Sequence, residues 1–516
     1  MGRAMRSLLV SAIACALLLL CFDRALNAIH PNDYTIRAGN VRSGFLLPNF
    51  HDFEQREDGS SYRWSRPESM IVIGPVGSGG PTLVTLSLGG RPEPATLRLA
   101  ISGLATYPLE ASVVPRRYAF LVPSSGQPET RIAIQSPAYS APGDPRELGF
   151  ILESVHIHLF SDTPRFPPPV FFALQLAALS GFALCLWRVR LPWLVATVVL
   201  GAALIAAIWV WLLPYAFLYL QRLAVAAWVL VALSWWVVPR LERSRWLAGP
   251  TEARMLWGIA LGAMILRLVG VLYPPFGGQD LSYHHLPRLG RAIMGGLIII
   301  EPSSEFRGGS IINPPGLYLL LMPGLLLTHD WLGFVQGVLA LLDGCSALLV
   351  GLLARRLGGG RTAALIAASL YAASPTAFAA HFFGFYTQIF GQWLMAPIGL
   401  VLMDEALAYR RRWLIAGALL LVATLTHIGV AILGCTWLAW AWLITLPVER
   451  RRGRPRALAT VALILAGVGA LAIMLLYADF LPTALSRPLN GAVPTGANWF
   501  PGATPFLARG MLLAFG

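Results

Sequence analysis

Charge is scarce in this chain of 516 residues: only 12% of them are charged, and lysine is missing altogether. Ordinary soluble domains carry about 25% charged residues. Hydrophobic residues make up 56% of the sequence, which is more apolar surface than a water-exposed fold can cover. These proportions exclude a disordered chain and an ordinary soluble protein, and they predict a protein solvated by lipid.

Cysteine is also rare, with five residues in the whole chain. All five lie within strongly apolar runs, and no two are spaced as a Cys-x-x-Cys pair. The sequence therefore excludes a disulfide-stapled scaffold and a cysteine metal site.

Arginine, by contrast, is abundant: it accounts for all 39 basic residues and gives a formal net charge of +14. Such an excess is known in nucleic-acid-binding proteins, but in membrane proteins it marks the cytoplasmic loops. Here the arginines cluster beside apolar runs, so we expect membrane lipids as neighbours and no nucleic-acid partner.

Residues 1–29 contain an apolar run, residues 7–22, that follows Arg3 and Arg6. A run this short is either a cleaved signal peptide or a signal anchor. Both place the residues that follow outside the cytoplasm.

Residues 30–165 have a different character, because clusters of Pro, Gly and Ser separate short runs in which apolar and polar residues alternate. Three of these runs cover residues 82–88, 96–101 and 155–160. The spacing predicts an extracytoplasmic all-β sandwich that resembles a jelly roll.

Residues 166–516 form the third predicted region, a polytopic α-helical membrane domain. A helix needs roughly 20 apolar residues to cross the hydrocarbon core. With the first segment, we predict about eleven transmembrane helices. The remaining ten cover residues 168–187, 191–213, 223–239, 255–273, 331–353, 362–380, 386–403, 413–427, 429–447 and 457–478. The last residues, 506–516, look like the opening of a further helix, which is expected if the sequence is truncated at its C-terminus.

The arginines test this topology, since alternate junctions between the predicted helices carry them. An apolar stretch at residues 317–327 would break the alternation if it crossed the membrane. It is too short and contains Pro323, so we interpret it as a juxtamembrane or re-entrant element. Residues 274–330 then form one large extracytoplasmic loop.

The most polar part of this loop carries Asp280, His284, Arg288 and Arg291, spaced by four, four and three residues. If the segment is helical, these side chains share one face. A carboxylate at the membrane edge can accept the proton of an acceptor hydroxyl, and guanidinium groups neutralise a phosphate leaving group. The alternative is a salt-bridged stripe that anchors a surface helix.

Two charged residues lie within predicted spans, where an unpaired charge is costly. Arg267 lies near the outer end of its span, and we interpret it either as a phosphate ligand or as a side chain that reaches lipid headgroups. Asp343 lies near the middle of its span. It is expected either to hydrogen-bond to Ser346 or a neighbouring helix, or to relay protons in a transporter.

Histidines gather on the predicted outer side, at His284, His285, His329, His381 and His427. No His-Glu-x-x-His or Asp-x-Asp signature accompanies them. We therefore predict no metal site and no cofactor, with a divalent cation as the alternative.

The order of these motifs resembles the GT-C superfamily of integral membrane glycosyltransferases, and in particular the bacterial relatives of protein mannosyltransferases and aminoarabinose transferases. The resemblance covers roughly residues 255–480. It is carried by Asp280, the segment Tyr283-His-His-Leu-Pro-Arg288, the element Asn313-Pro-Pro-Gly-Leu-Tyr318, the span closing in Leu352-Leu-Ala-Arg-Arg-Leu-Gly358, Ala373-Ser-Pro375 and Leu425-Thr-His427.

The resemblance implies an enzyme that transfers a hexose or pentose from a polyprenyl-phosphate-linked donor, with inversion, on the extracytoplasmic side of the cell membrane. It places the catalytic base at Asp280. The doubled His284-His285 departs from the more usual Tyr-His pair, and a second acidic pair typical of metal-dependent members is missing. The β domain is an addition to the minimal family pattern.

Our first hypothesis is therefore a glycosyltransferase of the cell envelope acting on a glycan, lipid or protein acceptor. Asp280 is the base, Arg288, Arg291 and Arg267 bind the donor phosphate, and Tyr283, His284, His285 and His427 orient the substrates. The alternatives are a transporter or flippase of a lipid-linked saccharide and a non-catalytic scaffold that binds a cell-surface glycan. A transporter should carry polar residues at matching depths through several spans, and the sequence offers mainly Arg267 and Asp343.

Overall fold

The computed structural model contains two compact units. Unit 1 comprises residues 1–233 and 273–275, and unit 2 comprises residues 234–272 and 276–516. The residues that the structure describes are 19–20, 32–39, 41–73, 81–101, 106–123, 129–144, 146–160, 169–189, 201, 205, 215–274, 276, 285–297, 300–303, 309–451 and 455–478.

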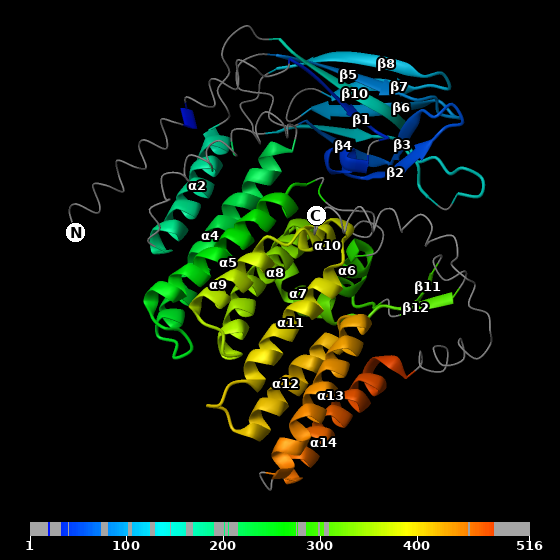
Figure 1. The fold of residues 1–516 in the computed structure, drawn as a ribbon. Helices are drawn as coiled ribbons and strands as arrows, with labels where there is room; N and C mark the ends of the chain where they lie inside the picture. Colours follow the sequence, from blue (N-terminus) through cyan, green and yellow to red (C-terminus); the bar gives the residue numbers. More distant parts are fainter. Residues whose placement is uncertain are drawn as a thin grey trace. The chain divides into compact units, whose positions relative to one another are not determined.

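Unit 1 contains the predicted all-β region, which is a sandwich of two antiparallel sheets (Figure 1). The six-stranded sheet consists of β1 (Asp33–Arg37), β2 (Phe50–Gln55), β3 (Ser61–Ser65), β5 (Thr82–Leu88), β8 (Arg116–Val122) and β10 (Ile151–Leu159). The four-stranded sheet consists of β4 (Glu68–Ile73), β9 (Thr130–Gln135), β6 (Ala95–Ile101) and β7 (Thr106–Ala111), in that spatial order. A short 3₁₀ helix, η1, covers Val41–Leu46.

The alternation of apolar and polar residues explains the sandwich. In β5, Val84, Leu86 and Leu88 are buried in the core between the sheets, and the residues between them point the other way. The first strand, β1, pairs antiparallel with the last strand, β10, so that Asp33 lies opposite His158. The two ends of the β domain therefore meet on neighbouring strands.

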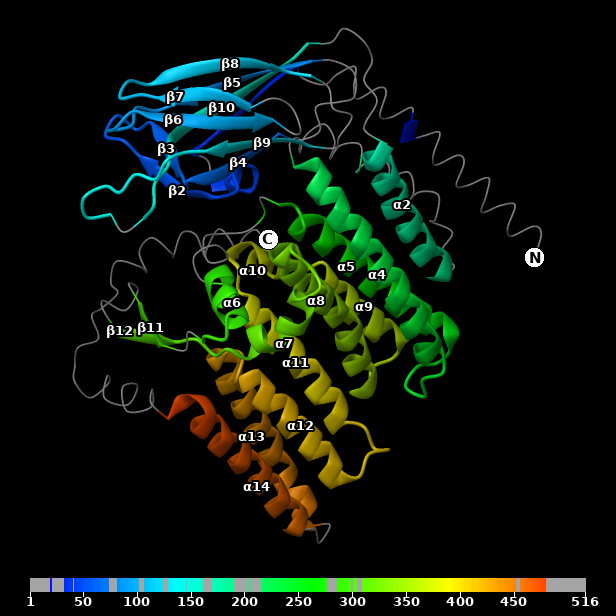
Figure 2. The ribbon, with the colours of Figure 1, turned by 180° about the vertical axis from the view of Figure 1, so that it is seen from behind.

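Unit 1 also holds α2 (Pro169–Val189) and the first part of α4 (Ala216–Glu242). The other helices belong to unit 2, and Figure 2 shows them from behind. They are α5 (Pro250–Val271), α6 (Leu286–Ile293), α7 (Gly316–Leu325), α8 (Trp331–Arg356), α9 (Arg361–Ala372), α10 (Pro375–Phe383), α11 (Tyr386–Leu402), α12 (Tyr409–Thr424), α13 (Ile428–Arg451) and α14 (Pro455–Ala472), followed by the π-helical turn η4 (Ile473–Tyr477). A hairpin of β11 (Ile300–Ser303) and β12 (Gly309–Ile312) lies between α6 and α7.

Five helical segments of the described chain are long and apolar enough to cross a membrane, as expected for a membrane protein. They are Ala216–Glu242, Pro250–Val271, Trp331–Arg356, Arg361–Phe383 and Ala459–Tyr477. Shorter apolar helices cover Pro169–Cys185, Gly316–Leu325 and Ile432–Ile444. The predicted spans at 7–22 and 191–213 lie largely outside the described residues, so the count of eleven remains a prediction.

The centre of unit 2 is α8, which packs against α5, α9 and α11. Close packing with α5 depends on Gly344, because a Cβ atom there would lie 2.6 Å from the Cα of Met264 and 2.7 Å from its backbone nitrogen. The two helix backbones therefore touch, which is typical of small residues between membrane helices.

The element that we expected not to cross the membrane is α7. It is ten residues long and contains Pro323, in agreement with an apolar helix too short to span the bilayer. Its first residue, Gly316, donates its backbone N–H to the carbonyl oxygen of Leu425 at 2.8 Å. A Cβ atom at Gly316 would lie 2.5 Å from that oxygen, so glycine is required for this contact.

Candidate functional site

A buried ion pair joins two helices at the centre of unit 2. Arg267 on α5 donates from Nε to the carboxylate of Asp343 on α8, and the side chains are 0% and 7% exposed. The two opposite charges neutralise each other in an apolar interior, where burying either charge alone would cost about 3–5 kcal/mol of free energy. The expectation that Asp343 faces a partner inside the bundle agrees with this geometry, although the partner is Arg267 and not Ser346, whose hydroxyl donates to Leu342.

The two Nη groups of Arg267 donate to backbone carbonyls at the end of α9, where the helix breaks before α10. Pro375 has no N–H group and cannot donate to the carbonyl four residues earlier, that of Tyr371. The Arg267 Nη2 group donates to the Tyr371 carbonyl at 3.3 Å, and Nη1 donates to the Ala372 carbonyl at 3.2 Å. Arg267 is thus bound by protein groups on three sides and is fully buried, so its side chain does not reach lipid headgroups. Its binding of a donor phosphate stays a prediction.

Two more side chains complete the cluster around the carboxylate. The Tyr371 hydroxyl donates to Asp343 Oδ1 at 2.6 Å, and His381 Nε2 lies 3.4 Å from Asp343 Oδ2. His381 is fully buried on α10, and its ring faces that of Tyr386 at 6.5 Å between centroids. The cluster of Arg267, Asp343, Tyr371 and His381, which we call the buried charge cluster, therefore ties together α5, α8, α9 and α10.

A second polar group surrounds His285, immediately before α6. His285 Nδ1 lies 2.6 Å from the hydroxyl oxygen of Tyr318 on α7, and its ring faces Tyr386 at 5.2 Å. The Tyr386 ring thus lies near both His285 and His381. The segment expected to carry the chemistry is thereby connected to the buried charge cluster through aromatic contacts.

The helix α6 places the two arginines predicted to bind phosphate. Leu289 and Ala292 face the bundle and pack against α7, whereas Arg291 is exposed. Arg288 is largely buried, at 9% exposure. The two arginines are three positions apart, so they lie on neighbouring positions of one side of α6.

His427 lies between the end of α12 and the start of α13, two residues after Leu425, which contacts Gly316. Its Nδ1 accepts the backbone N–H of Val430 at 3.2 Å and so caps the start of α13. Two motifs quoted for the family resemblance, more than a hundred positions apart in the chain, therefore meet at one place.

An apolar groove of about 740 Å³ lies along α8, α9, α11 and α13. Its lining is almost entirely hydrophobic, and the polar exceptions are Ser346, Tyr371 and Gln392. The apolar residues that line it include Val350, Leu353, Leu357, Met395, Met403, Leu433 and Trp437. Because Tyr371 also binds Asp343, one end of the groove touches the buried charge cluster.

Three of the predicted site residues, Asp280, Tyr283 and His284, lie outside the described residues. The structure does describe His285, Arg288, Arg291, Arg267 and His427. Among the described residues, no group of three or more His, Cys, Asp and Glu side chains could hold a metal ion.

Sequence reasoning missed Tyr318, Tyr371 and Tyr386. Tyr318 closes the Asn-Pro-Pro-Gly-Leu-Tyr element, and Tyr371 lies four residues before Pro375. The signal that could have found them is a hydroxyl-bearing aromatic within or beside an apolar run, which needs a hydrogen-bond partner when it is buried.

No protein-family model matches the chain, and no curated protein does. Partial matches occur among solved structures. One is the C-terminal CBM6 module of a marine laminarinase from Zobellia galactanivorans, with 14% identity over 25% of this chain and 99% of that chain, at a TM-score of 0.18.

Two further matches are longer enzymes. An exo-β-1,3-galactanase from Phanerochaete chrysosporium has 12% identity over 25% of this chain and 30% of its own, at a TM-score of 0.18. A GH26-CBM35 β-(1,4)-mannanase from Podospora anserina has 9% identity over 30% of this chain and 35% of its own, again at a TM-score of 0.18. At these values the likeness identifies neither the activity nor the ligand of this chain.

Proposed function

We propose that the protein is a membrane glycosyltransferase that moves a sugar from a polyprenyl-phosphate-linked donor to an acceptor outside the cytoplasm. The observation that carries the proposal is the apolar groove of about 740 Å³ whose polar end is Tyr371. Its volume lies within the usual range for small-molecule sites, about 300–1,000 Å³. A groove lined by Leu, Met and Trp on membrane helices suits a prenyl chain, which cannot leave the bilayer.

The arginines of α6 supply the charge that such a donor needs. A guanidinium offers a planar fork of donors that matches a phosphate. In this proposal Arg288 and Arg291 neutralise the leaving phosphate, and Asp280 accepts the proton of the acceptor hydroxyl. His285 and His427 orient the substrates, together with Tyr283 and His284.

Arg267 receives a different role from the one suggested by its position in the sequence. Its guanidinium already binds Asp343 and two backbone carbonyls. We therefore assign it to positioning: it fixes the break between α9 and α10, and with it Tyr371 at the end of the groove.

The alternative, a flippase of the same lipid, would need charged groups along its path. Neither Arg267 nor Asp343 lines the groove, because both are enclosed between helices. This arrangement favours the enzyme over the flippase.

The proposal is tested with radiolabelled polyprenyl-phosphate hexoses and pentoses supplied to membranes that contain the protein. The wild type is expected to release sugar from one of these donors. Replacing the base by Asp280→Asn should lower the rate by about 10²–10⁴-fold, the usual contribution of general base catalysis.

Asp330→Asn is the matched control, because Asp330 lies in the same predicted loop and caps α8 by accepting the N–H of Gly333. Asparagine caps a helix equally well, so activity should persist. Equal activity of Asp280→Asn and the wild type would reject the assigned base. Donor movement across proteoliposomes without sugar release would favour the flippase.

A further inference from the structure

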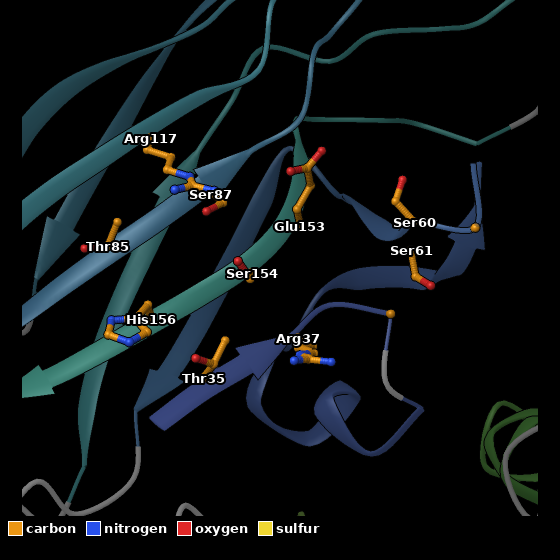
Figure 3. Close-up of a pocket in the computed structure, with 12 residues that line it drawn as sticks. Thr35, Arg37, Ser60, Ser61, Thr85, Ser87, Arg117, Glu153, Ser154 and His156 are labelled. Carbon is orange, nitrogen blue, oxygen red and sulfur yellow. The ribbon is translucent and has the colours of Figure 1, made fainter. Parts of the chain in front are cut away.

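A polar groove of about 870 Å³ lies on the six-stranded sheet, on the face turned away from the sandwich core (Figure 3). All of its lining residues belong to unit 1. Its lining contains no Phe, Tyr, Trp or aliphatic side chain, and consists of Thr35, Arg37, Gly39, Gly59, Ser60, Ser61, Thr85, Ser87, Arg117, Glu153, Ser154 and His156.

The strand register places these side chains in rows across the sheet. Arg37 on β1 lies opposite Ser154 on β10, Ser154 lies opposite Ser87 on β5, and Ser87 lies opposite Arg117 on β8. A guanidinium therefore stands at each end of one row, with two hydroxyls between them. Three strand spacings of about 4.8 Å put the two arginine Cα atoms about 14 Å apart.

The neighbouring row of the sheet also consists of polar side chains. Thr35 lies opposite His156, and His156 lies opposite Thr85. The groove floor is thus a set of short hydroxyl groups, each able both to donate and to accept hydrogen bonds.

The carboxylates near the groove are already engaged. Glu153 accepts from Arg56 at 2.7 Å, and Asp33 lies 2.7 Å from His158. The amide and hydroxyl of Ser60 hold the pKa of Asp58 below its usual range.

The two arginines of the row differ from these groups. Among the described residues, neither Arg37 nor Arg117 has a hydrogen bond or an ion pair. Both side chains are exposed. The groove therefore carries two free positive charges over a hydroxyl floor.

We propose that this groove binds an anionic glycan, with carboxylates of a uronate-type saccharide paired to Arg37 and Arg117 and its hydroxyls bonded to the serines and threonines between them. Charge complementarity selects an anion, and the floor suits a ligand rich in hydroxyls. Other polymers fit less well. The groove has no Phe, Tyr or Trp side chain on which a base could stack, and its two central strands, β10 and β5, are paired on both sides, so a peptide cannot add to them as a further strand.

The test measures binding of a short oligogalacturonate to the full chain in nanodiscs. The same oligomer with methyl-esterified carboxyl groups serves as the neutral probe. Arg37→Gln and Arg117→Gln should each weaken binding of the acid form about tenfold, the loss expected for one charged hydrogen-bonded pair. The methyl ester should bind the wild type more weakly than the acid form does.

Arg98→Gln is the control variant, because Arg98 is an exposed arginine on β6 of the other sheet. It should bind like the wild type, and all three variants should unfold at the same temperature, since each replaced side chain is on the surface. Equal weakening by Arg98→Gln would mean unspecific attraction and overturn the site.

Three other outcomes would also overturn the proposal. They are unchanged binding by Arg37→Gln and Arg117→Gln, equal binding of the two probes, and tighter binding of single-stranded DNA of matched charge. None of these results depends on sugar transfer, so the groove and the proposed enzyme activity fail or succeed separately.

Discussion

Arg267 illustrates how much of a charged residue's role depends on tertiary neighbours. The sequence places it inside a span, where an unpaired charge is costly, and leaves two candidates for its partner, a substrate phosphate and a lipid headgroup. The structure places it against Asp343, 76 positions away in the chain. Nothing in either local sequence specifies that α5 and α8 are neighbours.

Asp343 was easier to interpret from the sequence, because a carboxylate in the middle of a span has no route to water or headgroups. Only an internal partner could satisfy it. The catalytic assignment of Asp280 has a different basis: it rests on the family resemblance and remains a prediction.

The ion pair between Arg267 and Asp343 should contribute to the stability of the folded protein. Arg267→Met and Asp343→Leu should each lower the free energy of unfolding by about 3–5 kcal/mol, because each leaves one buried charge unpaired. The double variant should lose less than the sum of the two. A double-mutant cycle measured by unfolding in bicelles checks this.

Ser346→Ala is the control for that cycle. Ser346 lies on the same helix but carries no charge, and its hydroxyl donates to the Leu342 carbonyl, so its loss should cost less than about 1 kcal/mol. If the losses of the two charged-residue variants simply add, the pair is not energetically coupled.

At the scale of elements, the β strands were the most predictable part. The expected run at 82–88 is β5, that at 96–101 lies within β6, and that at 155–160 overlaps β10. Strict alternation with Pro, Gly and Ser between runs is a strong signal for half-buried strands.

Helix interruptions were harder to predict than strands. The expected span at 362–380 is divided into α9 and α10 at Ser374. The sequence contains the Ala373-Ser-Pro375 motif, but no break was predicted there. A proline in an apolar run predicts either a kink or a break, and the outcome here depends on a distant arginine that binds the exposed carbonyls.

Gly344 gives a prediction for the contact between α5 and α8. Gly344→Ala should destabilise the protein by about 1–3 kcal/mol, because the new methyl group would meet the Met264 backbone, which cannot move without moving α5. Thermal unfolding in detergent measures the effect.

Gly262→Ala is the matched control on α5. No atom lies within 4 Å of a Cβ placed there, and alanine favours a helix over glycine. This variant should be neutral or slightly stabilising. Similar losses for the two alanine variants would show that backbone contact at Gly344 is unimportant.

For the whole molecule, composition predicted a membrane protein with a separate β region, and the two sheets and five membrane-length helices agree with that. The orientation of the chain in the membrane remains a prediction. It follows from arginines at alternate junctions, which mark the cytoplasmic side.

Cysteine labelling tests this orientation. Glu93→Cys, at an exposed site of the β domain, should react with an impermeant maleimide in intact cells. Glu405→Cys, in the exposed turn between α11 and α12, should react only after the membrane is permeabilised. The unmodified chain sets the background from its own cysteines, and the reverse pattern would place the proposed active face in the cytoplasm.

The antiparallel pairing of the first and last strands of the sandwich has an evolutionary and practical consequence. Since Asp33 and His158 are side by side, the polypeptide enters and leaves this module through adjacent points. Such a domain can be inserted, exchanged or deleted as one unit, because a short linker is enough to join the preceding and following segments of the chain when the domain is removed.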